Sequence, residues 1–144
     1  MATDNKELSR RILEDVWNQQ KLDAVDEMIA ADFAQHDSQS PLGVRGIEGY
    51  KQFVRHYLNA FPDCHFTVED QLAEGQMVVT RWTVTGTHRG DLGNIPATGR
   101  RMSVTGISWS RIENGKFVES WTNWDTLGML QQLGVAAAPA QQAA

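Results

Sequence analysis

Hydrophobic residues recur at helical spacing through the first part of the chain. One apolar stripe predicts a helix over residues 6–20, a second predicts a helix over residues 22–31, and a third predicts a helix over residues 47–61 that Pro62 ends. The three stripes consist of Leu8, Ile12, Leu13, Val16 and Trp17, then of Leu22, Val25, Met28 and Ile29, then of Ile47, Tyr50, Phe53, Val54, Tyr57, Leu58 and Phe61. Two connecting pieces complete this half, an extended one over residues 33–37 and a loop over residues 38–46.

From His65 onward apolar and polar positions alternate, which is the period of a strand. The Asn114-Gly115 pair predicts a tight hairpin, because both residues tolerate the positive φ values that such turns need. Leucines at helical spacing then predict a short helix over residues 126–133. The predicted strands cover residues 65–73, 77–88, 102–112 and 116–124, with a long glycine-containing loop over residues 89–99.

The order of these elements favours an α+β fold, in which N-terminal helices cover one face of a curved sheet of antiparallel strands. No internal repeat and no change of composition marks a boundary, so residues 1–134 are expected to form one domain. Residues 135–144, VAAAPAQQAA, are low in complexity and are expected to be a flexible tail.

The last predicted strand carries an unusual mixture of side chains on one face. If the strand is regular to its end, alternation places Phe117, Glu119, Trp121, Asn123 and Asp125 on the same side. A dry core would exclude the acids and the amide, and a solvated surface would seldom carry the rings, so the mixture indicates the wall of a partly wet pocket. Asp125 has two interpretations here: a pocket acid, or a helix N-cap worth about 1 kcal/mol.

Composition narrows the classes of partner. The hydrophobic fraction of 41% and the charged fraction of 22% are ordinary for a soluble globular protein. A net charge of -5, with no basic run longer than Arg100-Arg101, argues against nucleic acid. No apolar run approaches the roughly 18 residues of a membrane span. The polar N-terminus lacks an apolar signal core, so we expect a cytoplasmic protein without a membrane partner.

Several kinds of reactive centre lack their usual pattern in this sequence. A single cysteine, Cys64, leaves no internal disulfide and no cysteine-based zinc site, and its position favours a buried thiol over a nucleophile. The four histidines are scattered without metal-ligand spacing. The glycines do not form a dinucleotide-binding motif, and no G-x-S-x-G is present. We therefore expect neither a metal nor a cofactor.

Five segments of the chain carry a family pattern in a fixed order. The segments are 33–37 (FAQHD), 60–63 (AFPD), 80–90 (TRWTVTGTHRG), 93–100 (GNIPATGR) and 121–134 (WTNWDTLGMLQQLG). Together they resemble the SnoaL-like polyketide cyclase, or ester cyclase, family. The resemblance runs from about residue 8 to residue 134, and the order of the segments makes it more specific than any one of them.

The resemblance implies a cone-shaped α+β barrel of the nuclear-transport-factor-2-like superfold, with a deep pocket between helices and sheet. It also implies a homodimer or homotetramer, and a small-molecule substrate that is aromatic or polyketide-like. In the characterised cyclases of the family, the aspartate that matches Asp125 is the acid/base of an intramolecular aldol ring closure without metal or coenzyme. A polar residue in the neighbourhood of His36 and Asp37 is implied to help hold the substrate.

Other residues join the candidate site from their strands and helices. His36 stands beside the loop that would close the pocket mouth, and His88 shares parity with Trp82 and Val84, although a histidine at a strand end is more often a loop anchor. Both histidines are therefore candidate catalytic residues beside Asp125. The side chains expected to bind substrate are Phe33, Tyr57, Trp82, Ser108, Trp121 and Asn123.

A single carboxyl could perform an aldol closure if apolar surroundings bring its pKa nearer to neutrality than the model value of about 3.9. The rings expected around Asp125 would provide such a setting. Three other readings stay open: an isomerase on the same scaffold, a cofactorless hydroxylase, and a non-catalytic protein that binds an apolar small molecule.

Overall fold

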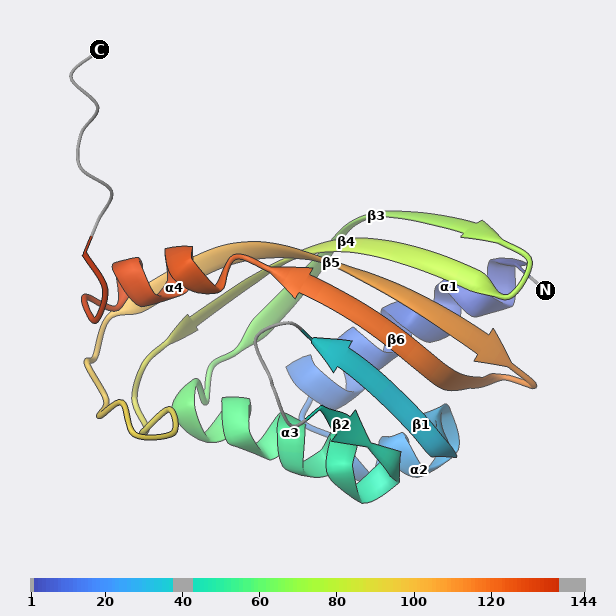
Figure 1. Ribbon diagram of the computed structural model, residues 1–144, viewed down its shortest axis with the longest axis horizontal. Coiled ribbons are helices and arrows are strands. Elements are labelled where there is room, and N and C mark those ends of the chain that lie inside the picture. The colour runs from blue at the N-terminus through green and yellow to red at the C-terminus, as the bar shows by residue number, and fades with distance from the viewer. Residues whose placement is uncertain (1, 38–42, 138–144) are drawn as a thin grey trace, which may run out of the picture.

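The computed structural model describes residues 2–37 and 43–137 (Figure 1). The first helix, α1, runs over Ala2–Arg11 and continues as a π-helical stretch, η1, over Ile12–Asn18. The remaining elements are the short 3-10 turn η2 (Leu22–Ala24), α2 (Val25–Met28), β1 (Ile29–Asp37), β2 (Val44–Arg45), α3 (Gly46–Ala60), β3 (His65–Glu74), β4 (Met77–Thr87), β5 (Arg101–Glu113), β6 (Lys116–Trp124) and α4 (Thr126–Gln132).

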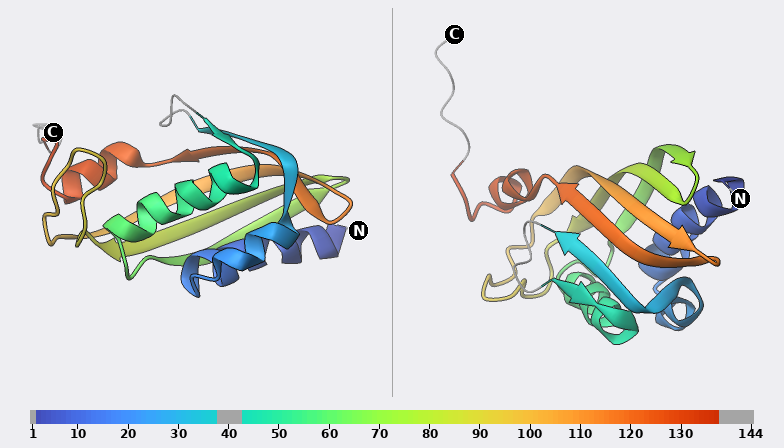
Figure 2. Two further views of the ribbon diagram at one scale, coloured as in Figure 1. Left: turned by 90° about the horizontal axis from the view of Figure 1, so that it is seen from below. Right: turned by 45° about the vertical axis from the view of Figure 1, so that its right-hand side comes forward.

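One curved sheet of six strands, in the order β2-β1-β6-β5-β4-β3, forms the body of the molecule. The neighbours pair antiparallel except β1 and β6, which run parallel and are joined by the long connection that parallel strands need. Helices α1, η1 and α3 lie against the same face of this sheet (Figure 2). The predicted α+β class is therefore confirmed. Among the described strands, β2 and β3 remain as free edges, so the sheet curves without closing into a barrel.

The core lies between the helices and the sheet. Val16 of η1, Phe33 of β1 and Val54 of α3 are almost completely buried there. Along β5 the buried residues Met102 and Val104 alternate with exposed ones, as expected for a strand covered on one face.

The second helix is shorter than its apolar stripe predicts, and β1 is longer. The stripe predicts a helix over residues 22–31, but α2 ends at Met28, and Ile29 already pairs with Phe117 of β6. Pairing with a strand that comes much later in the sequence thus overrides local helical spacing. Two predicted segments fall largely outside the described residues: the loop over 38–46, at residues 38–42, and the tail over 135–144, at residues 138–144.

The hairpin between β5 and β6 combines an expected turn with an unexpected bulge. Asn114 and Gly115 have φ values of 53° and 74°, which confirms the tight turn. The register then shifts: Phe117 pairs with Ile112, whereas Glu119 pairs with Arg111, and Val118 between them is an extra residue. Because side chains alternate along a strand, this bulge reverses the face of every later residue of β6.

Candidate active site

A cavity with a volume of about 90 Å³ lies between the helix-covered face of the sheet and the helices. Its wall consists mainly of rings: Trp17, Tyr50, Phe53, Tyr57, Phe61, Phe66, Trp82 and Trp124. Its polar side chains come from neighbouring strands: Gln35, Asp37, Ser108 and Thr122. An apolar hollow with a few polar groups on rigid strands is the usual form of a small-molecule site.

Asp37, the last residue of β1, is the single acid among the described residues that line this cavity. It is only 7% exposed, and its Oδ2 accepts a hydrogen bond of 3.2 Å from Nε1 of Trp124. The parallel pairing of β1 with β6 sets Asp37 opposite Thr122 and so brings it to the cavity. A buried carboxylate among rings is a group that can exchange protons with a bound carbon acid.

The two tyrosines of α3 that line the cavity keep their protons at ordinary pH. Burial, and to a smaller extent the negative charge of Asp37, raise the pKa of Tyr57 to about 12. Burial also raises the pKa of Tyr50 to about 12, although a hydrogen bond of 3.0 Å from Trp17 Nε1 to the Tyr50 hydroxyl opposes the shift. Tyr57 is therefore a hydrogen-bond donor to the cavity rather than a base.

Cys64 also lines the cavity, and it is buried as expected. Burial, followed by the nearby charge of Asp63, raises the pKa of its thiol to about 12. The thiolate, which is the nucleophilic form, is therefore scarce at neutral pH.

Four of the predicted substrate-binding residues lie in or next to the cavity. Tyr57, Trp82 and Ser108 line it, and Nε1 of Trp82 donates a hydrogen bond of 3.0 Å to the Ser108 hydroxyl. Phe33 lines an adjoining hollow and packs edge-to-face on Tyr50 with ring centroids 5.8 Å apart.

The prediction that Trp121 and Asn123 face the pocket is wrong. The bulge at Val118 turns both side chains to the opposite, outer face of the sheet, where Trp121 is 39% exposed. Their neighbours Thr122 and Trp124 line the cavity instead.

In the structure Asp125 is the N-cap of α4, which is one of its two predicted interpretations. Its Oδ1 accepts a hydrogen bond of 2.8 Å from the Gly128 N–H at the start of α4. The residue is exposed and does not line the cavity, so the burial among rings that was expected for it is absent. Asp125 as the acid/base stays a prediction from the resemblance.

His36 lies on the outer face of the sheet, because its neighbours Gln35 and Asp37 face inward. Its Nε2 is 2.6 Å from Oε2 of Glu119, and its ring stacks on Trp121. Hydrogen bonds from His36 and then from Arg111 lower the pKa of the half-buried Glu119 carboxyl. His36 therefore belongs to a surface cluster and not to the cavity.

His88 is buried at the end of β4, outside the cavity lining, and anchors the following loop. Its Nδ1 accepts a hydrogen bond of 3.2 Å from the Thr98 N–H and lies 3.0 Å from the Thr98 hydroxyl. Its backbone also exchanges hydrogen bonds with Gly99 and Arg100. Through these contacts His88 anchors the loop that follows β4, as the loop-anchor interpretation describes.

Two findings concern other classes of site. Among the described residues, no three His, Cys, Asp or Glu side chains are grouped closely enough to hold a metal ion. No helix within residues 2–37 and 43–137 is long and apolar enough to span a bilayer.

Comparison with known proteins agrees with this fold. The sequence model of the SnoaL-like polyketide cyclase family matches residues 7–133. Aklanonic acid methyl ester cyclase DnrD of Streptomyces peucetius is 32% identical over 135 residues, which cover 89% of each chain. TsrD from Streptomyces laurentii is 30% identical with a TM-score of 0.84 over 94% of this chain and 98% of its own. AclR from Streptomyces galilaeus, named as a candidate hydroxylase, is 26% identical with a TM-score of 0.84 over 98% of this chain and 87% of its own.

The chain therefore belongs to the SnoaL-like polyketide cyclase family, with the nuclear-transport-factor-2-like fold of its structural relatives. Membership supports a function of the cyclase type.

Proposed function

We propose that this protein closes a ring in an aromatic, polyketide-like carbonyl compound by an intramolecular aldol reaction, with Asp37 as the proton-transfer group. The observation that carries the proposal is the buried Asp37 carboxylate in a ring-lined cavity. The curated relative DnrD, a methyl ester cyclase, supports the substrate class.

In the proposed reaction, the Asp37 carboxylate takes a proton from a carbon next to carbonyl groups and leaves an enolate. The enolate carbon forms a bond to the carbon of a second carbonyl group in the same molecule, whose π electrons move to oxygen as an alkoxide. The protonated Asp37 then returns its proton to that oxygen. The product is an isomer of the substrate, so the reaction consumes no co-reactant.

The neighbours of Asp37 have distinct parts in this reaction. Trp124 Nε1 holds one carboxylate oxygen and so fixes the orientation of the base. The Tyr57 hydroxyl, which stays protonated, donates a hydrogen bond to the oxygen on which negative charge develops. The rings around them limit the access of water and keep the aromatic part of the substrate in place.

The proposal is tested in deuterium oxide with the wild-type protein and an aromatic polyketide methyl ester that carries an enolisable side chain. We expect a cyclised product, which is isomeric with the substrate apart from exchanged deuterium and is separated from it by chromatography, and deuterium at the enolisable carbon of recovered substrate, measured by mass spectrometry. Binding of the ester with neither exchange nor ring closure would show a binding protein instead.

A cofactorless hydroxylase is the second candidate, favoured by the similarity to AclR. Its first step would be the same loss of a proton from carbon. The two functions differ in the product, because hydroxylation consumes dioxygen, one atom of which enters the product while the other leaves as water with two electrons that the substrate supplies, whereas ring closure gives an isomer of the substrate. An oxygen electrode beside the mass measurement separates them.

The outer face of the sheet carries an exposed apolar patch. We define this outer-face patch as Met77, Ile107, Trp109, Trp121 and Asn123, which surround a shallow hollow. Ile107 is 47% exposed and Trp109 51%, and exposed rings gathered on one sheet face are typical of an interaction surface.

Charged residues of both signs lie beside this patch. Arg111 pairs with Glu119 and with Glu113, and His36 also contacts Glu119. A surface with both signs can match a copy of itself across a two-fold axis. We therefore propose that the outer-face patch forms the contact between two copies of this chain, in line with the homodimer or homotetramer that the family resemblance implies.

The expected result for Trp109→Glu is a monomer where the wild-type protein is a dimer, because a carboxylate would be buried without a partner at the contact. Sedimentation equilibrium measures the mass. Leu72→Glu is the matched control, because Leu72 is 71% exposed on β3 and lies outside the patch. A monomeric wild-type protein, or a Trp109→Glu dimer, would contradict the assignment.

A further inference from the structure

A second hollow adjoins the cavity and has a different lining. Its volume is about 50 Å³, and hydroxyl groups dominate its polar surface. We call it the hydroxyl chamber and define it by Ser9, Thr80, Ser108, Ser110, Ser120 and Thr122. Ser108, Thr122, Trp82 and Tyr50 line both hollows, so chamber and cavity share a wall.

The sheet register arranges these hydroxyls in two rows on the helix-covered face. In the first row Thr80 pairs with Ser108, Ser108 with Thr122, and Thr122 with Asp37. In the second row Ser110 pairs with Ser120, and Ser120 with Gln35. The rows are two residues apart, or about 7 Å along the strands. The second row thus lies one step farther along the strands than the Asp37 carboxylate.

The chamber can form hydrogen bonds with either a carbonyl oxygen or a hydroxyl group. The Ser110 and Ser120 hydroxyls are 2.8 Å apart and those of Ser108 and Thr122 are 3.3 Å apart, and either member can be the donor in each pair. Each hydroxyl has one proton and two lone pairs, so the rows can donate to a carbonyl or accept from a hydroxyl. No charged side chain is among the described residues that line the chamber, which favours a neutral group.

Ser9 supplies an independent sign that the chamber is a ligand site. It is 5% exposed, it lines the chamber, and its Oγ has no hydrogen-bond partner among the described residues. A buried hydroxyl without a partner is costly and is usually satisfied by a ligand or an ordered water.

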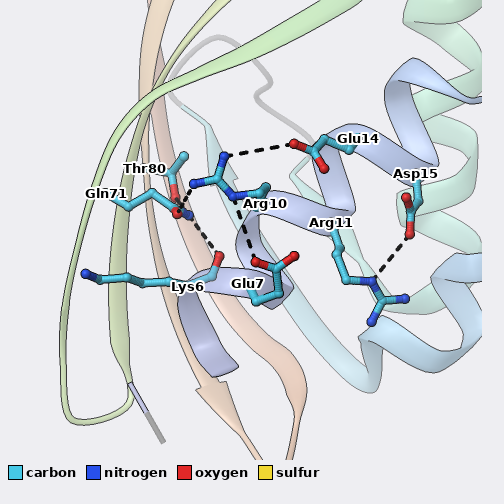
Figure 3. Close-up of polar contacts among 8 residues, drawn as sticks. All are labelled: Lys6, Glu7, Arg10, Arg11, Glu14, Asp15, Gln71 and Thr80. Atoms are coloured by element: carbon cyan, nitrogen blue, oxygen red, sulfur yellow. Dashed lines mark hydrogen bonds and ion pairs between the residues drawn. The ribbon is translucent and has the colours of Figure 1, made fainter. Parts of the chain in front are cut away.

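Polar contacts join helix α1 to β3 and β4 beside Thr80 (Figure 3). Gln71 of β3 donates from Nε2 to the Lys6 carbonyl at 2.9 Å and to the Thr80 hydroxyl at 3.2 Å, and its Oε1 accepts from Arg10 at 3.3 Å. These bonds join α1, β3 and β4 around Thr80. On its other side the chamber shares a wall with the cavity, so a ligand in the cavity can reach its hydroxyls.

We infer that the Ser110 and Ser120 hydroxyls of the hydroxyl chamber bind a neutral oxygen substituent, a phenol or a ring carbonyl, at the end of the substrate remote from the carbon that exchanges its proton with Asp37. The substrate class is thereby an enolisable aromatic ketone with an oxygen on its distal ring. This inference rests on the proposed function, because it takes the cavity beside Asp37 as the place where the substrate binds. Ligand sites for drug-sized molecules are typically about 300–1,000 Å³, so a bicyclic probe suits these smaller hollows better than several fused rings.

The experiment compares 2-acetylnaphthalene with 6-hydroxy-2-acetylnaphthalene, which differ only in the distal hydroxyl. Quenching of tryptophan fluorescence reports binding, because Trp17, Trp82 and Trp124 line the cavity. The wild-type protein should bind the hydroxylated probe about 3- to 10-fold more tightly, the value of one or two net hydrogen bonds. The Ser110→Ala/Ser120→Ala variant should lose this preference and bind both probes with equal Kd.

The double variant removes both partners of one hydrogen bond, which proteins tolerate better than the loss of one partner. Thermal unfolding checks that it folds, and Ser103→Ala, an exposed serine of β5, is the matched control that keeps the wild-type preference. A preference that persists in the double variant overturns the inference. Equal binding of both probes by the wild-type protein also overturns it, and would mean that the chamber holds internal water only.

Deuterium exchange at the acetyl methyl group of the same probes separates this inference from the proposed function. A preference that depends on Ser110 and Ser120, without exchange, would support the chamber and contradict the proposed chemistry. Deuterium exchange without a preference for the hydroxylated probe would support the proposed chemistry and contradict the role of the chamber.

Discussion

Asp37→Asn is expected to lower the rate of ring closure by about 10²- to 10⁴-fold, the usual contribution of acid–base catalysis by one side chain. The amide has nearly the shape of the carboxylate and can still accept the hydrogen bond from Trp124 Nε1, so the cavity should keep its form. It cannot take a proton from carbon at ordinary pH. Turnover of the methyl ester and Kd for the unreactive product should therefore separate, with kcat lost and binding retained.

Asp125→Asn is the matched control for this variant. Asp125 is exposed and caps α4 through the Gly128 N–H, and the asparagine oxygen can accept the same bond. We expect turnover close to that of the wild-type protein and a small change in Tm. The reverse pattern, with Asp125→Asn inactive and Asp37→Asn active, would return the acid/base role to the residue that the family resemblance indicates.

Gly106→Ala is expected to lower the free energy of unfolding by about 1–3 kcal/mol, the usual effect of overpacking. A Cβ at Gly106 of β5 would lie 2.4 Å from two ring carbons of Trp82 and 2.8 Å from Cβ of Trp124. Trp82 has little room to move, because its Nε1 is bonded to Ser108 and its ring packs against Phe66 at 5.0 Å. Urea unfolding at unchanged m-value measures the loss.

The same variant should weaken ligand binding, since both tryptophans are cavity walls. Gly49→Ala in α3 is the control, because the nearest atom to its Cβ would be 3.9 Å away. Alanine favours a helix interior over glycine by roughly 0.5–1 kcal/mol, so this variant should be neutral or slightly more stable. Equal stability of Gly106→Ala and wild type would show that the rings above Gly106 can yield.

The strands were easier to predict than the faces that they present. Alternation and the Asn114-Gly115 turn locate β6 at the residues where the structure has it. The bulge at Val118 then reverses the later side chains, so Trp121 faces outward and Trp124 inward. Both faces of this strand mix rings with polar groups, and nothing in such a pattern reveals an extra residue.

The face on which the site residues of β1 lie could be predicted more closely than the face of those of β6. Strand alternation over residues 33–37 places Phe33, Gln35 and Asp37 on one face and His36 on the other. Parity alone could therefore have separated His36 from Asp37. Parity could not have shown which of these two side chains points toward the helices. That depends on the parallel pairing of β1 with β6, which is remote in sequence.

The hydroxyl rows also affect how this cavity can change over evolution. Each serine or threonine belongs to a strand whose backbone bonds are made with its neighbours regardless of the side chain. Exchanging serine for alanine at such a position alters one oxygen atom and leaves the backbone ladder intact. Because losing one member of a bonded pair costs more than losing both, descendants of this scaffold can change substrate preference most readily by exchanging these hydroxyls in pairs on an unchanged backbone.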